Sequence, residues 1–503
     1  MPKRSSGCFT CRARKVRCDE AKPECNICLR RGVKCPGYRP TQSFILHTFD
    51  ERTEKPGIIK EDENVYRYAN QTQKGKETGG FSVLQPRPSG DMKLEPAVPR
   101  QVSPIAIDRV QHLSNFISIY LPQWQGEAFT PPTALILSLP YHPTSKQVLL
   151  TALDAVSAAQ IAVSDKNYQI INRCRSLYGT ALGHLMKSIN QPKIPQDDET
   201  LLATYLLALY EVFVGVTNGH GFFYHVQGLL RLFTQRGPSS LNTKLSMDVF
   251  HGTRYYSMTI GYHVRKASIL DSPDWLEVTS RAAIADPWVS LMDICIRIPR
   301  LLERTDKLTR AGGTPEQFEN IIIDSQLLAD RAFEWFANFE RHGPLYDKVS
   351  ISSFDGFSKI CDDLLFDPVF TFRSFAASTT YLLYWMSMLV MRSNSFLLVR
   401  KYQNLALNQL LAWDRELAGY ADCICRGVPS SCRPSTGFTG RFSTLTPLVI
   451  AKKYFEAKKA KKEATWCEKA YYGTRVPGLY TPPIPIEPSP GMIQLVQNSQ
   501  RYI

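Results

Sequence analysis

Residues 7–38 read GCFTCRARKVRCDEAKPECNICLRRGVKCPGY and hold six cysteines, Cys8, Cys11, Cys18, Cys25, Cys28 and Cys35. Their spacing is C-x2-C-x6-C-x6-C-x2-C-x6-C, so one C-x2-C-x6-C unit occurs twice. A segment this short cannot fold on an apolar core, so cross-links or metal ions must supply the folding free energy. The N-terminus MPKRSSGCFT has no apolar signal region, and we therefore expect reduced thiols that bind metal and not disulfides.

Counting coordination positions predicts how the cysteines share the metal. Two tetrahedral zinc ions need eight positions, and six cysteines supply only six sulfur atoms. The count closes if two thiolates bridge both ions, and the first cysteines of the two units, Cys8 and Cys25, are the natural bridging pair. The other cysteines then complete the two sites in pairs, Cys11 with Cys18 and Cys28 with Cys35. RING and ribbon sites use four or eight ligands, usually with histidine, and no histidine lies in this segment.

The positive charge of the chain is concentrated around these cysteines. Residues 1–40 contain eleven lysines and arginines against three acidic residues, a net charge of +8 out of +14 for all 503 residues. Six thiolates and two zinc ions sum to −2, which the surrounding basic residues offset. The segment therefore suits an anionic partner.

The same stretch resembles the zinc binuclear cluster of fungal transcription regulators, over about 30 residues that include every cysteine and Pro23 between the two halves. The resemblance implies that a short helix after the second cysteine enters the major groove of double-stranded DNA. It also implies that Lys15 reads a CGG-type triplet, with Arg14 beside it for base or phosphate contacts. Lysine or arginine donating to O6 and N7 of guanine is the commonest specific contact in that groove.

The other basic residues are expected to hold phosphates and to set register without reading sequence. They are Arg12, Arg17, Arg30, Arg31 and Lys34. About five neutralised phosphates predict a slope of log K against log salt of about −4 to −5. At 100° per residue, the four basic residues between Cys11 and Cys18 would spread around a helix, so they cannot all face bases.

The resemblance further implies a location in the nucleus and contacts with the transcription machinery. The rival interpretation is a zinc-dependent protein-interaction adaptor that has no sequence preference on DNA.

Four regions are predicted from composition and hydrophobic pattern. Residues 1–40 form the cluster, 41–105 a flexible linker, 106–472 a large all-α domain and 473–503 a proline-rich tail. Helices are expected around 170–189, 222–235, 322–340, 374–391 and 395–418. Several helical fragments resemble the regulatory domain that follows many such clusters. The linker has no run of apolar heptads, so a homodimer through the helical domain and binding as a monomer both stay open.

The remaining motifs favour ordinary structural roles. The uncharged segment 374–391 carries four serines and threonines and reads as a buried core helix, so no membrane is expected as a partner. Cys423, Cys425 and Cys432 make a weak metal motif because no fourth ligand lies nearby, and His220 and His225 favour packing. The lysines between Lys452 and Lys462 suit a solvated face or an import or DNA-backbone patch. No catalytic motif is found, and a metabolite receptor would need a concave pocket with convergent polar groups.

Overall fold

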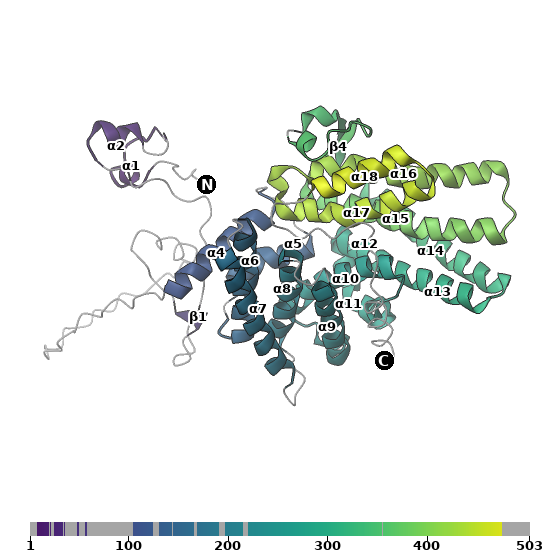
Figure 1. The fold of residues 1–503 in the computed structure, drawn as a ribbon, viewed down its shortest axis with the longest axis horizontal. Coiled ribbons are helices and arrows are strands. Elements are labelled where there is room, and N and C mark those ends of the chain that lie inside the picture. The colour runs from purple at the N-terminus through teal and green to yellow at the C-terminus, as the bar shows by residue number, and fades with distance from the viewer. Residues whose placement is uncertain are drawn as a thin grey trace, which may run out of the picture. The chain divides into compact units, whose positions relative to one another are not determined.

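The computed structural model forms two compact units, the cysteine unit (residues 1–46) and the helical unit (residues 47–503) (Figure 1). The structure describes residues 8–19, 21, 25–33, 35, 48–49, 56–57, 104–123, 130–142, 144–164, 168–190, 197–214, 220–354 and 356–474. Each unit is described by itself.

The cysteine unit contains two short helices, α1 (Phe9–Ala13) and α2 (Asn26–Arg30). Its core consists of cysteine side chains, with Cys18 and Ile27 packed against them. The described residues of this unit thus include no apolar core of ordinary composition, as the sequence predicts.

Most of the predicted linker lies outside the described residues, as does the predicted tail from residue 475 onward. Within the linker, the two-residue strands β1 (Thr48–Phe49) and β2 (Pro56–Gly57) pair antiparallel. The first described helix of the helical unit, α4 (Pro104–Tyr120), begins at a proline, a residue whose fixed φ suits the first turn. The last described helix, α18 (Lys461–Gly473), ends next to the predicted boundary at residue 472.

The helical unit is built almost entirely from α-helices, which confirms the predicted fold class. Between α4 and α18 the chain forms α5 (Pro131–Ser138), α6 (Gln147–Ser164), α7 (Tyr168–Ile189), α8 (Asp198–Val214), α9 (His220–Arg236), α10 (Lys244–Val264), α11 (Pro273–Ala285), α12 (Pro287–Cys295), α13 (Ile298–Ala311), α14 (Pro315–Phe339), α15 (Phe375–Tyr402), α16 (Leu407–Ser431) and α17 (Gly437–Ala457). Short 3-10 turns join some of them: η1 (Leu139–Tyr141), η2 (Pro238–Ser240), η3 (Ile269–Asp271), η4 (Ile351–Ser353), η5 (Phe357–Lys359) and η6 (Pro434–Thr436).

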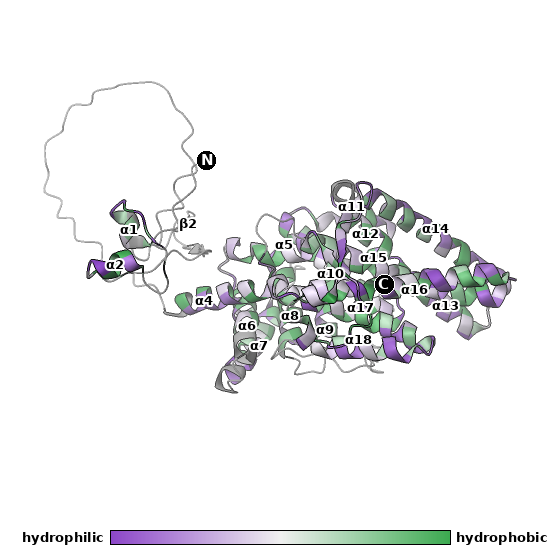
Figure 2. Ribbon diagram, turned by 90° about the horizontal axis from the view of Figure 1, so that it is seen from above, coloured by the Kyte–Doolittle hydropathy of each residue, from purple (hydrophilic) through white to green (hydrophobic). Residues whose placement is uncertain are grey.

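Local sequence fixes where several of these helices begin and end. Thr314 caps α14 by accepting a hydrogen bond from the Gln317 backbone N–H, and the Gln317 side chain accepts one from the Thr314 N–H in return. Gly312 ends α13 with a left-handed φ of 68°, a conformation that costs glycine little. Helices α13 and α14 carry both hydrophilic and hydrophobic residues along their length (Figure 2), which is typical of helices with one solvent face.

Helix α15 is the central helix of this unit and corrects one prediction. The sequence suggested separate helices at 374–391 and 395–418, but α15 runs unbroken to Tyr402, and α16 starts at Leu407. The polar residues at and next to the predicted gap are accommodated inside the helix. Ser395 donates to the Met391 carbonyl at 3.0 Å, and Asn394 donates to the Thr305 hydroxyl at 3.0 Å.

By length and composition α15 could cross a membrane, but 83% of its most apolar window is buried inside the protein. It is therefore the core helix that the sequence predicts, and its first turn is capped by Ser374, which accepts from the Ala377 N–H.

A strand pair within the helical unit was not predicted. Strands β3 (Tyr346–Val349) and β4 (Val369–Phe372) are antiparallel, with Tyr346 opposite Phe372. Their aromatic residues pack on α15: the ring of Tyr346 lies 5.2 Å from that of Tyr381, centroid to centroid. Four-residue strands carry too little alternation to be detected in a chain dominated by helical periodicity.

Candidate metal centre and nucleic-acid interface

Each C-x2-C-x6-C unit of the sequence folds into the same local structure. Helix α1 starts directly after Cys8, and α2 starts directly after Cys25. The Cys11 N–H bonds the Cys8 sulfur at 3.4 Å, and the Cys28 N–H bonds the Cys25 sulfur at 3.3 Å. The first sulfur of each unit therefore caps its helix and receives partial positive charge from the helix start, which favours the thiolate.

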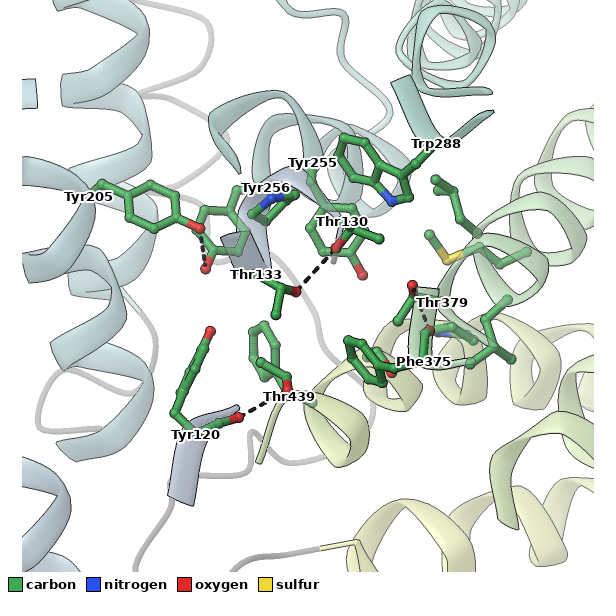
Figure 3. Close-up of a pocket in the computed structure, with 17 residues that line it drawn as sticks. Tyr120, Thr130, Thr133, Tyr205, Tyr255, Tyr256, Trp288, Phe375, Thr379 and Thr439 are labelled. Carbon is green, nitrogen blue, oxygen red and sulfur yellow. Dashed lines mark hydrogen bonds between the residues drawn. The ribbon is translucent and has the colours of Figure 1, made fainter. Parts of the chain in front are cut away.

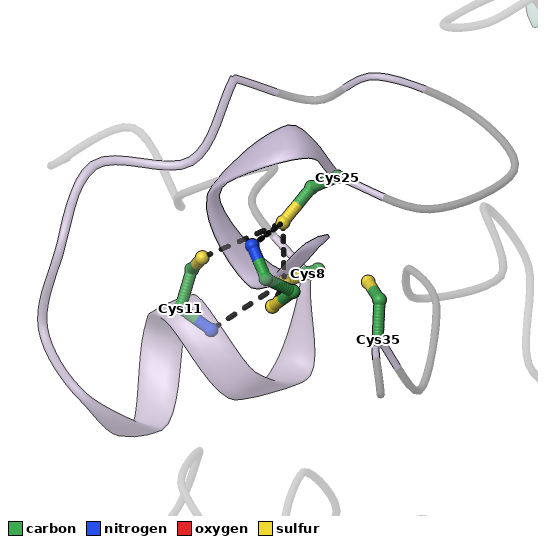
Figure 4. Packing of buried hydrophobic residues seen from close by; sticks show 5 residues of the cluster. Cys8, Cys11, Cys25 and Cys35 are labelled. Atoms are coloured by element: carbon green, nitrogen blue, oxygen red, sulfur yellow. Dashed lines mark hydrogen bonds between the residues drawn. The ribbon is translucent and has the colours of Figure 1, made fainter. Parts of the chain in front are cut away.

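The six sulfur atoms gather into two overlapping groups of four. One group contains Cys8, Cys11, Cys18 and Cys25, and the other contains Cys8, Cys25, Cys28 and Cys35; within each, all sulfurs lie within 4.8 Å of one another. Cys8 and Cys25 belong to both groups, and their sulfurs are 3.6 Å apart (Figure 4). This is the shared edge that the count of coordination positions requires.

The spacing of the sulfurs fits zinc. Zn–S bonds of about 2.3 Å place the sulfurs of a tetrahedron about 3.8 Å apart, and the Cys11–Cys25 and Cys8–Cys28 pairs measure 3.7 and 3.8 Å. The cysteines form no disulfides. Burial raises the pKa of the Cys8 thiol to about 12, so ligation by zinc, which requires the thiolate, releases protons. The donor set thus holds two zinc ions, with Cys8 and Cys25 common to both.

Both helices of the cysteine unit end in the same way. The Val16 N–H bonds the Cys11 carbonyl at 3.0 Å, and the Val33 N–H bonds the Cys28 carbonyl at 3.1 Å. These six-residue closures are Schellman motifs, in which the residue before the donor adopts a left-handed conformation. That residue is Gly32 in the second unit, with φ 64°, and Lys15 in the first, with φ 56°.

Lys15 therefore occupies a position where the repeat itself places glycine. A left-handed conformation costs a residue with a Cβ about 1 kcal/mol. A Cβ built on Gly32 meets nothing within 4 Å, so the left-handed backbone, and not a lack of space, is what favours glycine there. Residues held in such conformations cluster at functional sites.

The helix that was expected to enter the DNA groove differs from the prediction. It was expected after Cys11, with four basic residues spread around it, but α1 ends at Ala13 and contains Cys11. Arg14, Lys15 and Arg17 lie beyond its C-terminal end, because the Schellman motif turns the chain back there.

The structure exposes the predicted contact residues that it describes. The exposed side chains are Arg14, Lys15, Arg17, Arg30 and Arg31. None of them forms an ion pair within the described part of the cysteine unit. The one described carboxylate there, Asp19, accepts a hydrogen bond from the Asn26 N–H at 3.1 Å instead. The side chain of Arg12 and the whole of Lys34 lie outside the described residues.

The weak metal motif in α16 does not assemble. Within the described residues, the candidate sulfur groups all lie in the cysteine unit. Cys425 faces Cys467 of α18 at 3.6 Å, sulfur to sulfur, and not its sequence neighbours in the motif. Burial raises the pKa of Cys423 and Cys432 to about 12, so both are neutral thiols.

His225 and the lysine run also have structural partners. Nε2 of His225 lies 2.8 Å from the Tyr178 hydroxyl, while the side chain of His220 lies outside the described residues. Lys452 is nearly buried between α17 and α18, where it pairs with Glu456 at 2.5 Å and Glu468 at 3.6 Å. The run is thus not one uniform basic face. Its remaining members are exposed: Lys453, Lys458, Lys459, Lys461 and Lys462.

Comparison with known proteins gives two family matches. Residues 6–43 match the fungal Zn(2)-Cys(6) binuclear cluster domain, and residues 110–277 match the fungal specific transcription factor domain. Together they cover the cysteine unit and helices α4 to α10, with the start of α11.

Several curated relatives match part of the chain. The chain is 31% identical over 98 residues to pestheic acid cluster transcriptional regulator 3 of Pestalotiopsis fici, covering 19% of this chain and 16% of that protein. It is 54% identical over 35 residues to the aspercryptin biosynthesis cluster-specific transcription regulator of Emericella nidulans, covering 7% and 6%. The chain therefore aligns with only a small part of each relative's length. No solved structure matches.

The sulfur geometry agrees with the first family match: residues 6–43 form a fungal Zn(2)-Cys(6) binuclear cluster domain, and residues 110–277 carry a fungal specific transcription factor domain.

Proposed function

We propose that this protein is a nuclear, sequence-specific DNA-binding regulator of genes transcribed by RNA polymerase II. Its zinc cluster reads a G/C-rich element of the CGG type in the major groove, and Lys15 makes the base contact. The observation that carries this proposal is the left-handed backbone of Lys15, at the position where the second unit of the repeat has Gly32. A lysine retained there at a cost in stability points to a use for its ammonium group.

The charge distribution supports the second part of the proposal, the phosphate contacts. Arg17, Arg30 and Arg31 are exposed, and none of them pairs with Asp19, the described carboxylate of the cysteine unit. We assign these arginines, with Arg12 and Lys34, to the phosphate backbone, where they set register and supply salt-dependent affinity. Arg14 follows α1 directly beside Lys15 and is assigned to the same groove.

The names of the relatives support a narrower role. Two of them are named for the biosynthetic cluster that they regulate, the pestheic acid and the aspercryptin cluster. We propose that this chain likewise regulates a specific metabolic pathway, through contacts of the helical unit with the transcription machinery. A homodimer would give such a regulator two DNA half-sites.

Selection of bound sequences from a random duplex pool, with the full-length zinc-loaded protein, tests the proposal. The expected result is enrichment of a G/C-rich triplet, with the Lys15→Ala protein losing the preference at one or more of its positions. A second copy of the triplet at fixed spacing would show a dimer. Absence of any enriched sequence would refute the proposal and favour an adaptor that uses the zinc cluster to bind proteins.

A further inference from the structure

The helical unit contains a partly open cavity of about 70 Å³, and none of the described residues that line it is charged. Helices that are far apart in the sequence contribute to it. Tyr255 and Trp288 come from α10 and α12, and Phe375, Leu383 and Met386 come from α15. The cavity lies outside the cysteine unit and plays no part in the zinc site. Its walls are mostly apolar and aromatic, as is common in small-molecule sites.

Two polar groups of the cavity have no partner among the described residues. They are the hydroxyl of Tyr255 and the indole N–H of Trp288, and both point into the cavity (Figure 3). The rings of these two residues lie 6.4 Å apart, centroid to centroid. Trp288 is only 5% exposed, and Tyr255 is partly buried. Polar groups inside a protein are nearly always hydrogen-bonded to protein or to water, so these two groups can bind either water or an occupant of the cavity.

The other hydroxyls that line the cavity are already engaged. Tyr205 donates to the Tyr256 hydroxyl at 3.2 Å, Thr439 donates to the Tyr120 carbonyl at 2.9 Å, and the hydroxyls of Thr130 and Thr133 lie 3.1 Å apart. These bonds fix the walls. They leave Tyr255 and Trp288 as the groups that can recognise an occupant.

The chemistry of these two groups defines the class of occupant. An indole N–H only donates, so the occupant must present a hydrogen-bond acceptor. The described residues that line the cavity offer no charged group that could compensate an ionic occupant. The volume is about half of the roughly 150 Å³ apolar cavity that holds benzene. We propose that this cavity binds a small uncharged molecule whose carbonyl or hydroxyl oxygen accepts from Trp288 and Tyr255, with its carbon part against Phe375, Leu383 and Met386.

Fluorine NMR of the full-length, zinc-loaded protein labelled with 5-fluorotryptophan tests this site. The chain has seven tryptophans, and the Trp288→Phe protein assigns the signal of Trp288. The probe is 2-butanone, with about five heavy atoms, a size matched to the cavity. The Trp288 signal should shift saturably as 2-butanone is added, while the signals of the other tryptophans stay in place.

Two comparisons test the hydrogen bonds themselves. The Tyr255→Phe protein keeps the ring and loses the hydroxyl, so its Kd for 2-butanone should rise about fivefold. Tyr224→Phe is the matched control, because Tyr224 is 50% exposed and outside the cavity, and its Kd should not change. The hydrocarbon 2-methyl-1-butene, which has the shape of 2-butanone without the oxygen, should bind at least about fivefold more weakly.

Three results would overturn the proposal. A Trp288 signal that fails to saturate, or moves no more than the other tryptophan signals, would mean that the cavity holds only water. Equal binding of the ketone and the hydrocarbon would refute recognition of an acceptor oxygen. An unchanged Kd in the Tyr255→Phe protein would remove Tyr255 from the site.

Discussion

Replacing Lys15 by glycine separates the folding of the zinc cluster from its reading of DNA. Lys15 has a φ of 56°, and its counterpart in the second unit, Gly32, has a φ of 64°. Glycine adopts this conformation without the steric cost that a Cβ imposes, so Lys15→Gly should relieve about 1 kcal/mol of backbone strain. Folding of the cysteine unit is coupled to metal binding, so this relief should appear as zinc affinity raised by up to about fivefold.

The same substitution should damage DNA recognition. A good contact from lysine to the O6 and N7 atoms of guanine is worth about 1–3 kcal/mol of discrimination, which corresponds to about 5- to 150-fold. We therefore expect the ratio of affinities for CGG-containing and scrambled duplexes to fall by that factor in the Lys15→Gly protein. Zinc affinity, measured by chelator competition, and DNA preference, measured by fluorescence anisotropy at fixed salt, should then change in opposite directions.

The reciprocal variant is the control. Gly32→Lys places a lysine in the left-handed position of the second unit, where a Cβ meets nothing within 4 Å. Zinc affinity should fall by about fivefold, and the DNA preference should not change. A Lys15→Gly protein that keeps its sequence preference would refute the base contact, and one that binds zinc more weakly would refute the argument from backbone strain.

Three further predictions concern the metal, the phosphate contacts and pH. Cys8 belongs to both sulfur groups and Cys35 to only one. Cys8→Ser should therefore weaken the binding of both zinc ions, whereas Cys35→Ser should directly weaken the binding of one. Metal analysis of the purified proteins measures the zinc content, and equal losses of zinc in the two variants would contradict shared ligation. Arg31 is exposed, and Arg31→Ala should make the slope of log K against log salt shallower by about 0.9 without altering the CGG preference; a changed preference would instead place Arg31 on a base. Burial lowers the pKa of His225 to about 4 and that of His251 to about 3, so the unfolded chain binds more protons, and stability is lost as pH falls below about 6.5. At pH 5 each histidine should lower the free energy of unfolding by about 2 kcal/mol. The thermal unfolding temperature of the His225→Gln protein should therefore change less between pH 6.5 and pH 5. An equal change in both proteins would contradict a buried, neutral His225.

The zinc centre could be predicted because the ratio of cysteines to zinc ions limits how the cysteines can bind the metal. Six sulfurs for eight positions require two bridges, and the repeat selects Cys8 and Cys25, which are the two sulfurs common to both groups in the structure. The exposure of the basic residues followed from their charge.

The backbone at Lys15 could not be predicted in the same way. Helical periodicity placed this lysine on a helix after Cys11, but α1 ends at Ala13, and the hydrogen bond from Val16 to Cys11 is a consequence of the fold around the metal ligands. Comparing the two units position by position would have shown Lys15 aligned with Gly32. That alignment is the signal in the sequence for a left-handed residue.

The helical unit was predicted by class but not in its details. Periodicity identified helices, yet in the continuous α15 the side chain of Asn394 has its partner, Thr305, in another helix, α13. Likewise, the cavity next to Trp288 is lined by residues from α4 to α17. Local sequence patterns do not predict such contacts between residues that are far apart in the sequence.

The most direct test of the central claim, that this zinc cluster reads a DNA sequence, is one equilibrium measurement. The full-length protein loaded with two zinc ions is titrated with a CGG-containing duplex and with a scrambled duplex of equal length. Both titrations are made at about 0.15 M salt, where charges interact over a screening length of about 8 Å. The account predicts binding to the CGG duplex tighter by about 10³-fold or more, and loss of that preference when a chelator removes the zinc. Equal affinity for the two duplexes would contradict it.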